Sequence, residues 1–338
     1  MQEGKTIPKK RLFGLDLLKV LSMLFIIFHH LSKHGGFWAA STGATRWGIA
    51  VINGLFAPSV NIFVLVSAYL MIKKGRVSVK GYFRLYAEVV FYTLLTYAAA
   101  CLLGAQSFSA IMLLKCFLPI SYPNFWFAKI YFLMYLAVPL LLIVVRHLEK
   151  KPYERTLGAI LLILSLQTFL RLDILPLANG FGALWFMLLF LLAGYWVRFG
   201  VSLRKRYWAL IWAVSTVYMC LWVWQNGLDI GYAHIAVTLQ TLSAFGLLHD
   251  LRCEGRVVRG LTTYLSSCAF GIYLLHDGDL IRTLLHGRIL RTPSYYTRQT
   301  ALLWMLLFAL IILAAGLLAE SLRKLAVRMA GKLRKKDA

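Results

Sequence analysis

The first apolar segment carries the residues best suited to chemistry, and it reads LDLLKVLSMLFIIFHH over residues 15–30. In an α-helix, at about 100° per residue, Lys19 lies within about 20° of His30 and Asp16 within about 40° of it. One stripe therefore carries an acid and a cation near its start and an imidazole near its end. Charged groups in apolar helices usually face a cavity, where a neutral imidazole can take a proton from an alcohol. The structural alternative is that the two charged residues cap the helix at the headgroups, while His29, about 100° away, and His30 mark the far interface.

These residues must be positioned by helices that cross a membrane. Of the 338 residues, 60% are hydrophobic and 15% are charged, against about 45–50% and about 25% in soluble domains. A crossing helix needs roughly 20 mostly apolar residues, and segments rich in Leu, Ile and Ala favour helices over a barrel. The sequence predicts an all-α membrane protein, a polytopic bundle of about ten transmembrane helices. The predicted spans are about 14–32, 49–72, 82–103, 126–145, 157–175, 182–198, 207–224, 231–248, 262–281 and 301–320.

The distribution of basic residues predicts the orientation. The two terminal segments and alternate connections carry 27 of the 37 Lys and Arg residues, whereas the other connections carry 8. By the positive-inside rule, both termini are expected in the cytoplasm. The domain prediction is one transmembrane domain over 1–338, with a cytoplasmic N-terminus (1–13) and a basic cytoplasmic tail (321–338).

Charge and cysteine content exclude other classes. The net charge of +24 is that of many nucleic-acid-binding proteins, but here the basic residues fall in short bursts between apolar stretches, which argues against nucleic acid as a partner. The five cysteines show no CxxC or Cys/His metal-ligand spacing, so we expect no metal site and no tightly bound cofactor.

The stripe resembles the N-terminal signature of the acyltransferase family 3 membrane O-acyltransferases, Asp-x-x-Arg, then ten residues, then His. Lys19 stands at the Arg position, so the charge is kept but the planar fork is lost. Ala68 stands where the family's Phe-x-x-x-Ser-Gly-Tyr helix has Gly. Further motifs similar to the family's are Asn61–Leu70 (NIFVLVSAYL), Tyr82–Tyr92 (YFRLYAEVVFY), Phe125–Tyr131 (FWFAKIY) followed by Tyr135 and Pro139, and Ala269–Asp277 (AFGIYLLHD).

The resemblance implies transfer of an acyl group, usually acetyl from acetyl-CoA, to a sugar hydroxyl. The His-Asp ending and the Asn-Ile-Phe run look most like the branch associated with exopolysaccharide and cell-surface glycan O-acetylation. His30 is then the candidate general base, or alternatively a residue that is transiently acylated. His276 ends a span that runs towards the same outer side, so it is expected near His30 as a second acid/base or a positioning group. The structural alternative for His276 and Asp277 is a water-facing pair at a helix end.

Further residues are candidates for binding. Asn61 begins a span at the outer side, where it either donates to an acyl or sugar oxygen or caps a helix. The basic run 73–84 suits the phosphates of coenzyme A, and Arg84 matches a basic position of the family; topology and acidic lipid are the alternative explanation for the run. Glu88, one turn further in, is expected to pair with Arg84 or Lys19.

Aromatic and outer basic residues complete the candidate set. Trp126 and Tyr131 are candidates for a sugar or pantetheine path, although aromatic belts explain most such residues in membrane proteins. The outer segment 282–298 carries four arginines, and we expect Arg288 and Arg291 to contact an anionic glycan or a lipid-linked diphosphate sugar.

We therefore expect a multi-pass enzyme of the cell membrane, an acetyl-CoA-dependent O-acetyltransferase in contact with membrane lipid. The alternative is a transporter or flippase for lipid-linked sugars, because ten helices and intramembrane charges suit either function. The stripe with His30, together with His276, favours the enzyme.

Overall fold

The computed structural model describes residues 12–120, 125–170, 174–175 and 177–333, and the regular structure within these ranges is helical. Residues 1–11, 121–124, 171–173, 176 and 334–338 lie outside the described part of the chain. The all-α class is thus confirmed for the described residues. The helices are α1 (Phe13–Lys33), α2 (Phe37–Ala40), α3 (Gly43–Phe56), α4 (Ser59–Lys74), α5 (Val79–Leu102), α6 (Ala110–Cys116), α7 (Trp126–His147), α8 (Lys150–Leu170), η1 (Ala178–Gly180), α9 (Ala183–Phe199), α10 (Lys205–Asn226), α11 (Ile235–Leu248), α12 (Arg256–His276), α13 (Asp279–Thr283), η2 (Leu284–Ile289), η3 (Thr292–Ser294) and α14 (Ala301–Leu333).

Six segments of the described chain are long and apolar enough to cross a membrane, namely α1, α3 with α4, α5, α7, α10 and most of α14. Two shorter apolar helices, α9 and α11, accompany them. The chain is therefore a multi-pass membrane protein. The remaining two predicted spans correspond to α8 and α12, so the count of ten and the cytoplasmic location of both termini stay predictions.

Two of the predicted spans are interrupted in the structure. The span predicted over 49–72 is interrupted between α3 and α4, because Pro58 lacks the N–H that a continuous helix needs. The span predicted over 262–281 ends at His276, and a separate short helix, α13, follows it. This second break turns the chain at the end of α12.

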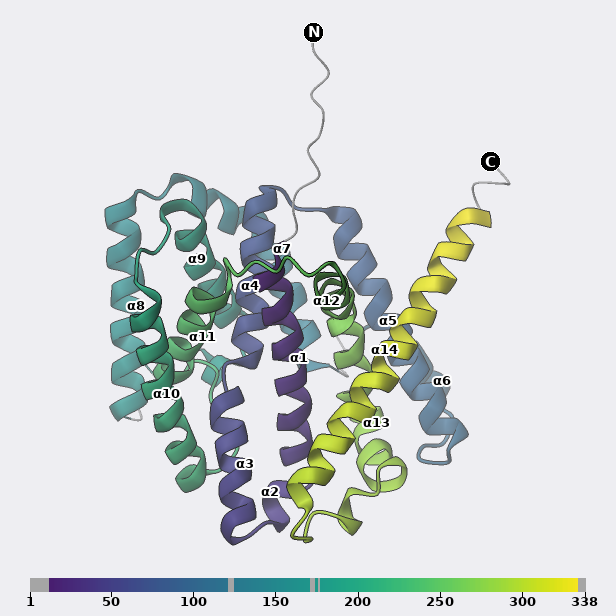
Figure 1. The fold of residues 1–338 in the computed structure, drawn as a ribbon. Coiled ribbons are helices and arrows are strands. Elements are labelled where there is room, and N and C mark those ends of the chain that lie inside the picture. The colour runs from purple at the N-terminus through teal and green to yellow at the C-terminus, as the bar shows by residue number, and fades with distance from the viewer. Residues whose placement is uncertain (1–11, 121–124, 171–173, 176, 334–338) are drawn as a thin grey trace.

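Helix α1 runs through the middle of the bundle, with α4, α12, α3 and α14 packed around it (Figure 1). Helices α8 and α10 lie at one side of the bundle and α5 and α6 at the other (Figure 1). Helix α1 begins, and α14 ends, at the upper side of this view. Residues near the end of α1 therefore lie deep among other helices.

Close approach between α12 and α14 depends on Gly271. A Cβ at this position would lie 2.5 Å from Glu320 Oε2. Glu320 is buried, accepts a hydrogen bond of 2.8 Å from Tyr92 of α5, and is paired with Arg323 at 2.7 Å. A buried carboxylate needs such partners, since an unpaired charge in the membrane is costly. The network joins α5, α12 and α14 into one side of the bundle.

Candidate active site

Two imidazoles meet where α1 and α12 end. The Nδ1 atom of His30 lies 3.1 Å from Nε2 of His276. Both side chains are buried, His30 at 8% and His276 at 2% relative exposure. The expectation that the ends of these two helices bring His30 and His276 together is therefore confirmed.

The hydrogen bonds assign the tautomers of the pair. His276 Nδ1 lies 2.7 Å from the carbonyl oxygen of Ile272, which can only accept, so Nδ1 carries the proton and Nε2 of His276 is the acceptor in the neutral ring. His30 Nδ1 must then be the donor at the 3.1 Å contact. In a neutral His30 ring, the other nitrogen, Nε2, consequently holds a lone pair. That is the arrangement a general base needs.

A carboxylate adjoins the pair. Asp277 Oδ1 lies 3.3 Å from Nδ1 of His30, and the side chain of Asp277 is completely buried. Arg282 holds the same oxygen with Nη2 at 2.9 Å and Nε at 3.0 Å, and its Nη1 reaches Asp279 at 2.6 Å. The break after α12 allows Arg282 to reach these carboxylates, because α13 turns Arg282 back towards the end of α12. A negative charge at this distance stabilises a protonated His30 ring.

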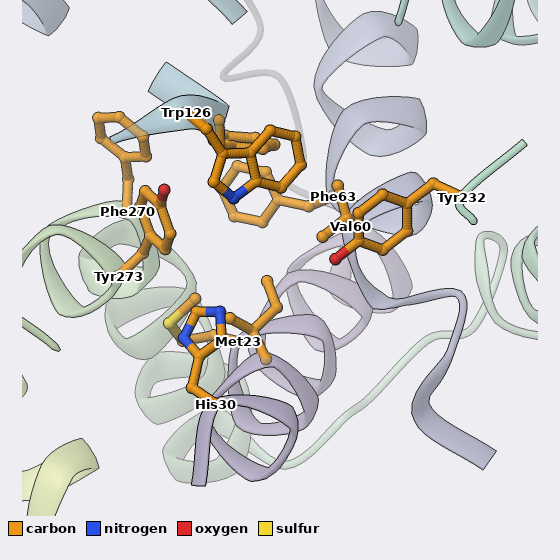
Figure 2. A pocket seen from close by; sticks show the side chains of 10 residues that line it. Met23, His30, Val60, Phe63, Trp126, Tyr232, Phe270 and Tyr273 are labelled. Atoms are coloured by element: carbon orange, nitrogen blue, oxygen red, sulfur yellow. The ribbon is translucent and has the colours of Figure 1, made fainter. Parts of the chain in front are cut away.

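An aromatic pocket opens from His30 towards the interior of the bundle. Figure 2 shows the His30 ring on α1 directed towards the Trp126 ring, between Tyr273 on one side and Tyr232 on the other. The enclosure is small and apolar, so it excludes water from the imidazole. The aromatic pocket is lined by Met23, Ile26, His30, Val60, Phe63, Trp126, Phe127, Tyr232, Phe270 and Tyr273.

A second, polar cavity adjoins the aromatic pocket at His30. Its volume is about 460 Å³, within the roughly 300–1,000 Å³ of small-molecule sites. His30, Trp126 and Tyr232 border both cavities. We call it the outer chamber, because it lies at the end of α1, which the sequence predicts to face the outer side. Its lining consists of His29, His30, Lys33, His34, Trp126, Asn179, Phe181, Leu228, Asp229, Ile230, Tyr232 and Arg282.

The other end of the α1 stripe serves a different role. Asp16 accepts hydrogen bonds from Thr263 at 2.9 Å and from Ser266 at 2.7 Å, which tie α1 to α12. Lys19 Nζ lies 5.7 Å from the centre of the Phe63 ring, at the wall of the aromatic pocket. At 1.5 Å rise per residue, Asp16 is about 21 Å along the helix from His30. Asp16 and Lys19 lie on the same face of α1 as His30, but they are not at the position where the imidazole would react.

Asn61 is held within the protein. Its Nδ2 donates to the carbonyl of Tyr232 at 2.8 Å, and its Oδ1 accepts from Trp185 Nε1 at 2.9 Å. The side chain is completely buried and lines neither the aromatic pocket nor the outer chamber. Asn61 thus fixes Tyr232, which borders both cavities.

The two aromatic candidates separate. Trp126 lines both cavities, and its ring stacks on that of Tyr232 with centroids 5.8 Å apart. Tyr131 lies one turn further along α7, where it stacks on Phe127 at 5.7 Å, and it lines neither cavity. Trp126 is therefore the better candidate for a substrate contact.

The basic candidates lie outside both cavities. Arg84 is exposed in the first turns of α5. Arg288 is exposed and donates to the carbonyl of Leu103 at 2.8 Å, while Arg291 is exposed with a positive φ of 48°. Glu88 is paired with Arg323 at 3.3 Å, a partner that sequence reasoning did not name.

Sequence reasoning missed several residues of the site. Arg282 was counted only as one of four outer arginines, although it is the cation that holds Asp277. Tyr273 was detectable, since it precedes His276 by one helical turn and so shares its face. Tyr232 could not be found in this way, because it lies in the loop before α11 and reaches the site only through tertiary packing.

Three side chains come close enough to hold a metal ion. Ligand atoms of His30, His34 and Asp277 lie within 4.8 Å of one another. Asp277 Oδ1 is paired with Arg282, and the Nδ1 atom of His30 donates to His276. A divalent cation bound through Oδ1 would have to compete with the guanidinium, whereas Asp277 Oδ2 is buried without a hydrogen-bond partner among the described residues.

Comparison with known proteins adds the family. The model of the acyltransferase domain of acyltransferase family 3 matches residues 12–320. No curated protein and no solved structure matches the chain significantly. The matched range includes both histidines, Asp277 and the helices that line the two cavities. The chain is a multi-pass membrane protein that belongs to acyltransferase family 3, and it is thus a transferase that acts between an acyl donor and an acceptor.

Proposed function

We propose that this protein transfers an acetyl group from acetyl-CoA to a hydroxyl of a cell-surface or lipid-linked glycan, with His30 as the general base. The observation that carries the proposal is the position of His30. Its ring is buried, fixed by His276, and borders both the aromatic pocket and the outer chamber. Both cavities therefore lead to the same imidazole ring.

The reaction follows from the assigned tautomers. Nε2 of His30 takes the proton of the acceptor hydroxyl while the oxygen attacks the thioester carbonyl carbon. The carbon–sulfur bond then breaks, and the thiolate of coenzyme A takes the proton from the imidazolium. Asp277, 3.3 Å from Nδ1, stabilises the imidazolium that exists between these steps. His276 keeps the ring oriented and is a positioning residue in this scheme.

The donor is proposed to enter from the side where α1 begins. The charge asymmetry of the connections predicts that this side faces the cytoplasm, where acetyl-CoA is made. Lys19 and Arg84 lie towards that side and supply positive charge for phosphates. The aromatic pocket, between Phe63 and His30, lies on this path. Its volume is only about 20 Å³, so its aromatic lining must move apart to admit the pantetheine arm and the acetyl thioester.

The acceptor is proposed to occupy the outer chamber. Sugar rings stack on aromatic faces, and Trp126 with Tyr232 offers such a surface beside His30. This arrangement agrees with the resemblance to the branch that acetylates exopolysaccharides and cell-surface glycans, and with a location in the cell membrane.

The test uses purified protein, acetyl-CoA labelled in the acetyl group, and a panel of glycans. We expect the wild type to release coenzyme A and to label at least one glycan, and His30→Ala to lose at least 99% of this activity, since a general base contributes about 10²–10⁴-fold. His147→Ala is the matched control, because His147 is exposed at the end of α7. If the wild type transfers no acetyl group but transports lipid-linked sugar, the proposed enzymatic function is contradicted and the flippase function is supported.

A further inference from the structure

A third cavity adjoins the outer chamber and has no role in the proposed acyl transfer. Its volume is about 410 Å³, and it shares His34 and Arg282 with the outer chamber. It lies between the end of α1 and the segment from α13 to η3. We call it the side cavity, and the polar residues that line it are His34, Arg282, Thr283, His286, Thr292 and Tyr296.

His286 indicates that the side cavity is a binding site. The side chain is only 4% exposed, yet neither of its ring nitrogens has a hydrogen-bond partner among the described residues. Buried polar groups are almost always hydrogen-bonded, so such a ring calls for a ligand or for water. It lies on η2, a single π-helical turn, and such turns occur frequently at functional sites.

The lining of the side cavity carries little net charge. The guanidinium of Arg282 is paired with two carboxylates, Asp277 at 2.9 Å and Asp279 at 2.6 Å. Burial and the charge of Arg282 lower the pKa of His34 to about 3 and that of His286 to about 4, so both rings are neutral near pH 7. Neutral imidazoles and hydroxyls suit hydroxyl groups better than phosphates or carboxylates.

We infer that the side cavity binds an uncharged sugar ring of the acceptor, next to the ring whose hydroxyl is acetylated. This inference rests on the proposed function for the identity of the neighbouring ring. Tyr296 offers an aromatic face, while His286 and Thr283 offer groups that donate and accept hydrogen bonds. The sequence predicts a contact with an anionic glycan at Arg288 and Arg291. The site inferred here instead consists of residues that line a cavity, and its ligand is a neutral sugar.

The test fills the side cavity and measures glycan binding without any reaction. A Cβ at Gly287 meets no heavy atom within 4 Å, and Gly287 lines the cavity, so Gly287→Phe occupies it without a clash at the backbone. Gly158→Phe is the matched control, because Gly158 on α8 also faces open space. The probe is a printed array of neutral and acidic glycans, read with fluorescently labelled protein in detergent.

We expect the wild type and Gly158→Phe to bind at least one neutral glycan, and Gly287→Phe to bind it at least tenfold more weakly. His286→Ala serves as a second variant in case Gly287→Phe fails to fold. Binding to acidic glycans alone, binding to none, or equal binding by Gly287→Phe and Gly158→Phe overturns the inference. If Gly287→Phe loses glycan binding but the wild type transfers no acetyl group, the glycan site in the side cavity is supported and the proposed reaction is contradicted.

Discussion

His30 and His276 are 246 positions apart in sequence, yet Nδ1 of one ring lies 3.1 Å from Nε2 of the other. The contact joins the ends of α1 and α12. Towards the other end of the same two helices, Ser266 donates to Asp16 at 2.7 Å. Helix α12 is thus tied to α1 at two levels, so the orientation of His30 depends on how these two helices pack.

Replacement of His276 should reduce turnover more than donor affinity. In His276→Ala, Nδ1 of His30 loses its acceptor at 3.1 Å and keeps only Asp277 Oδ1 at 3.3 Å, so the ring can leave the orientation that points Nε2 at the substrates. We expect kcat to fall about 100-fold, the usual effect of a small misplacement of a reacting group. KM for acetyl-CoA should change less than about threefold, since His276 does not line the aromatic pocket.

His276→Gln should recover part of this loss, because a side-chain amide oxygen can accept the hydrogen bond from His30. Steady-state kinetics of the two variants provide the comparison. Equal losses of kcat in both variants would mean that the hydrogen bond is not what positions His30.

Removal of the charge at Asp277 should affect both turnover and stability. Asp277→Asn keeps the shape of the side chain but removes the buried one of the two carboxylates paired with Arg282, beside the ring that becomes an imidazolium. We expect kcat to fall about 10³-fold and the fold to lose about 3 kcal/mol, typical for one partner removed from a buried pair.

The double variant Asp277→Asn/Arg282→Gln separates these two effects, since it also removes the guanidinium that has lost its buried partner. Its melting temperature should return towards that of the wild type, while its kcat stays low. Thermal unfolding and kinetics on the same preparations give the double-mutant cycle. Additive losses of stability would contradict a direct pair.

The aromatic pocket should limit the length of the acyl chain. Met23 is buried and lines this pocket beside His30, so Met23→Ala adds room at the acyl group. We expect the kcat/KM ratio of butyryl-CoA to acetyl-CoA to rise about tenfold or more, because each methylene in an apolar pocket is worth about 1–3 kcal/mol. Coenzyme A release measures both substrates.

Met305→Ala is the control for this experiment, since Met305 is equally buried but lies on α14 outside the pocket. Both variants should lose stability through the cavity that they create. An unchanged chain-length ratio in Met23→Ala would show that the acyl group does not lie in the aromatic pocket.

Acidification should destabilise the protein partly through His286. Burial lowers its pKa to about 4 in the fold, whereas an unfolded chain titrates near 6.5. Between these values the unfolded state binds the proton and the folded state does not, so stability is full above about pH 6.5 and falls as the pH approaches 4. His286→Gln cannot titrate, and it should therefore show a shallower fall of melting temperature from pH 7 to 4.5. Identical slopes for wild type and variant would contradict the burial of a neutral ring.

Much of the fold follows from hydropathy alone, because the bilayer demands long apolar helices at regular intervals. The break at Pro58 was detectable in principle, since proline removes a helical hydrogen bond. The turn after His276 was not, because a short apolar run such as LIRTLL continues the helical pattern while the packing of α13 decides the direction.

The proximity of His30 and His276 could be predicted from the direction of their helices. The hydrogen-bond and ion-pair partners of individual side chains could not be predicted in this way. Asn61 has the residue type of a ligand-binding group, yet Tyr232 and Trp185 saturate it. Arg282 and Arg288 look equivalent in sequence, but one holds a buried carboxylate and the other an exposed carbonyl. Such differences depend on tertiary contacts between segments far apart in the chain.

Chemical rescue of His30→Ala by imidazole tests most directly whether the His30 ring takes the proton of the acceptor. The outer chamber, about 460 Å³, admits a free imidazole to the vacated position. The account predicts that acetyl transfer by His30→Ala is reduced at least 100-fold and rises at least tenfold, with saturation, as imidazole is added, whereas His29→Ala shows no such rescue. Acetyl transfer by correctly folded His30→Ala at a rate within about threefold of the wild type would contradict it.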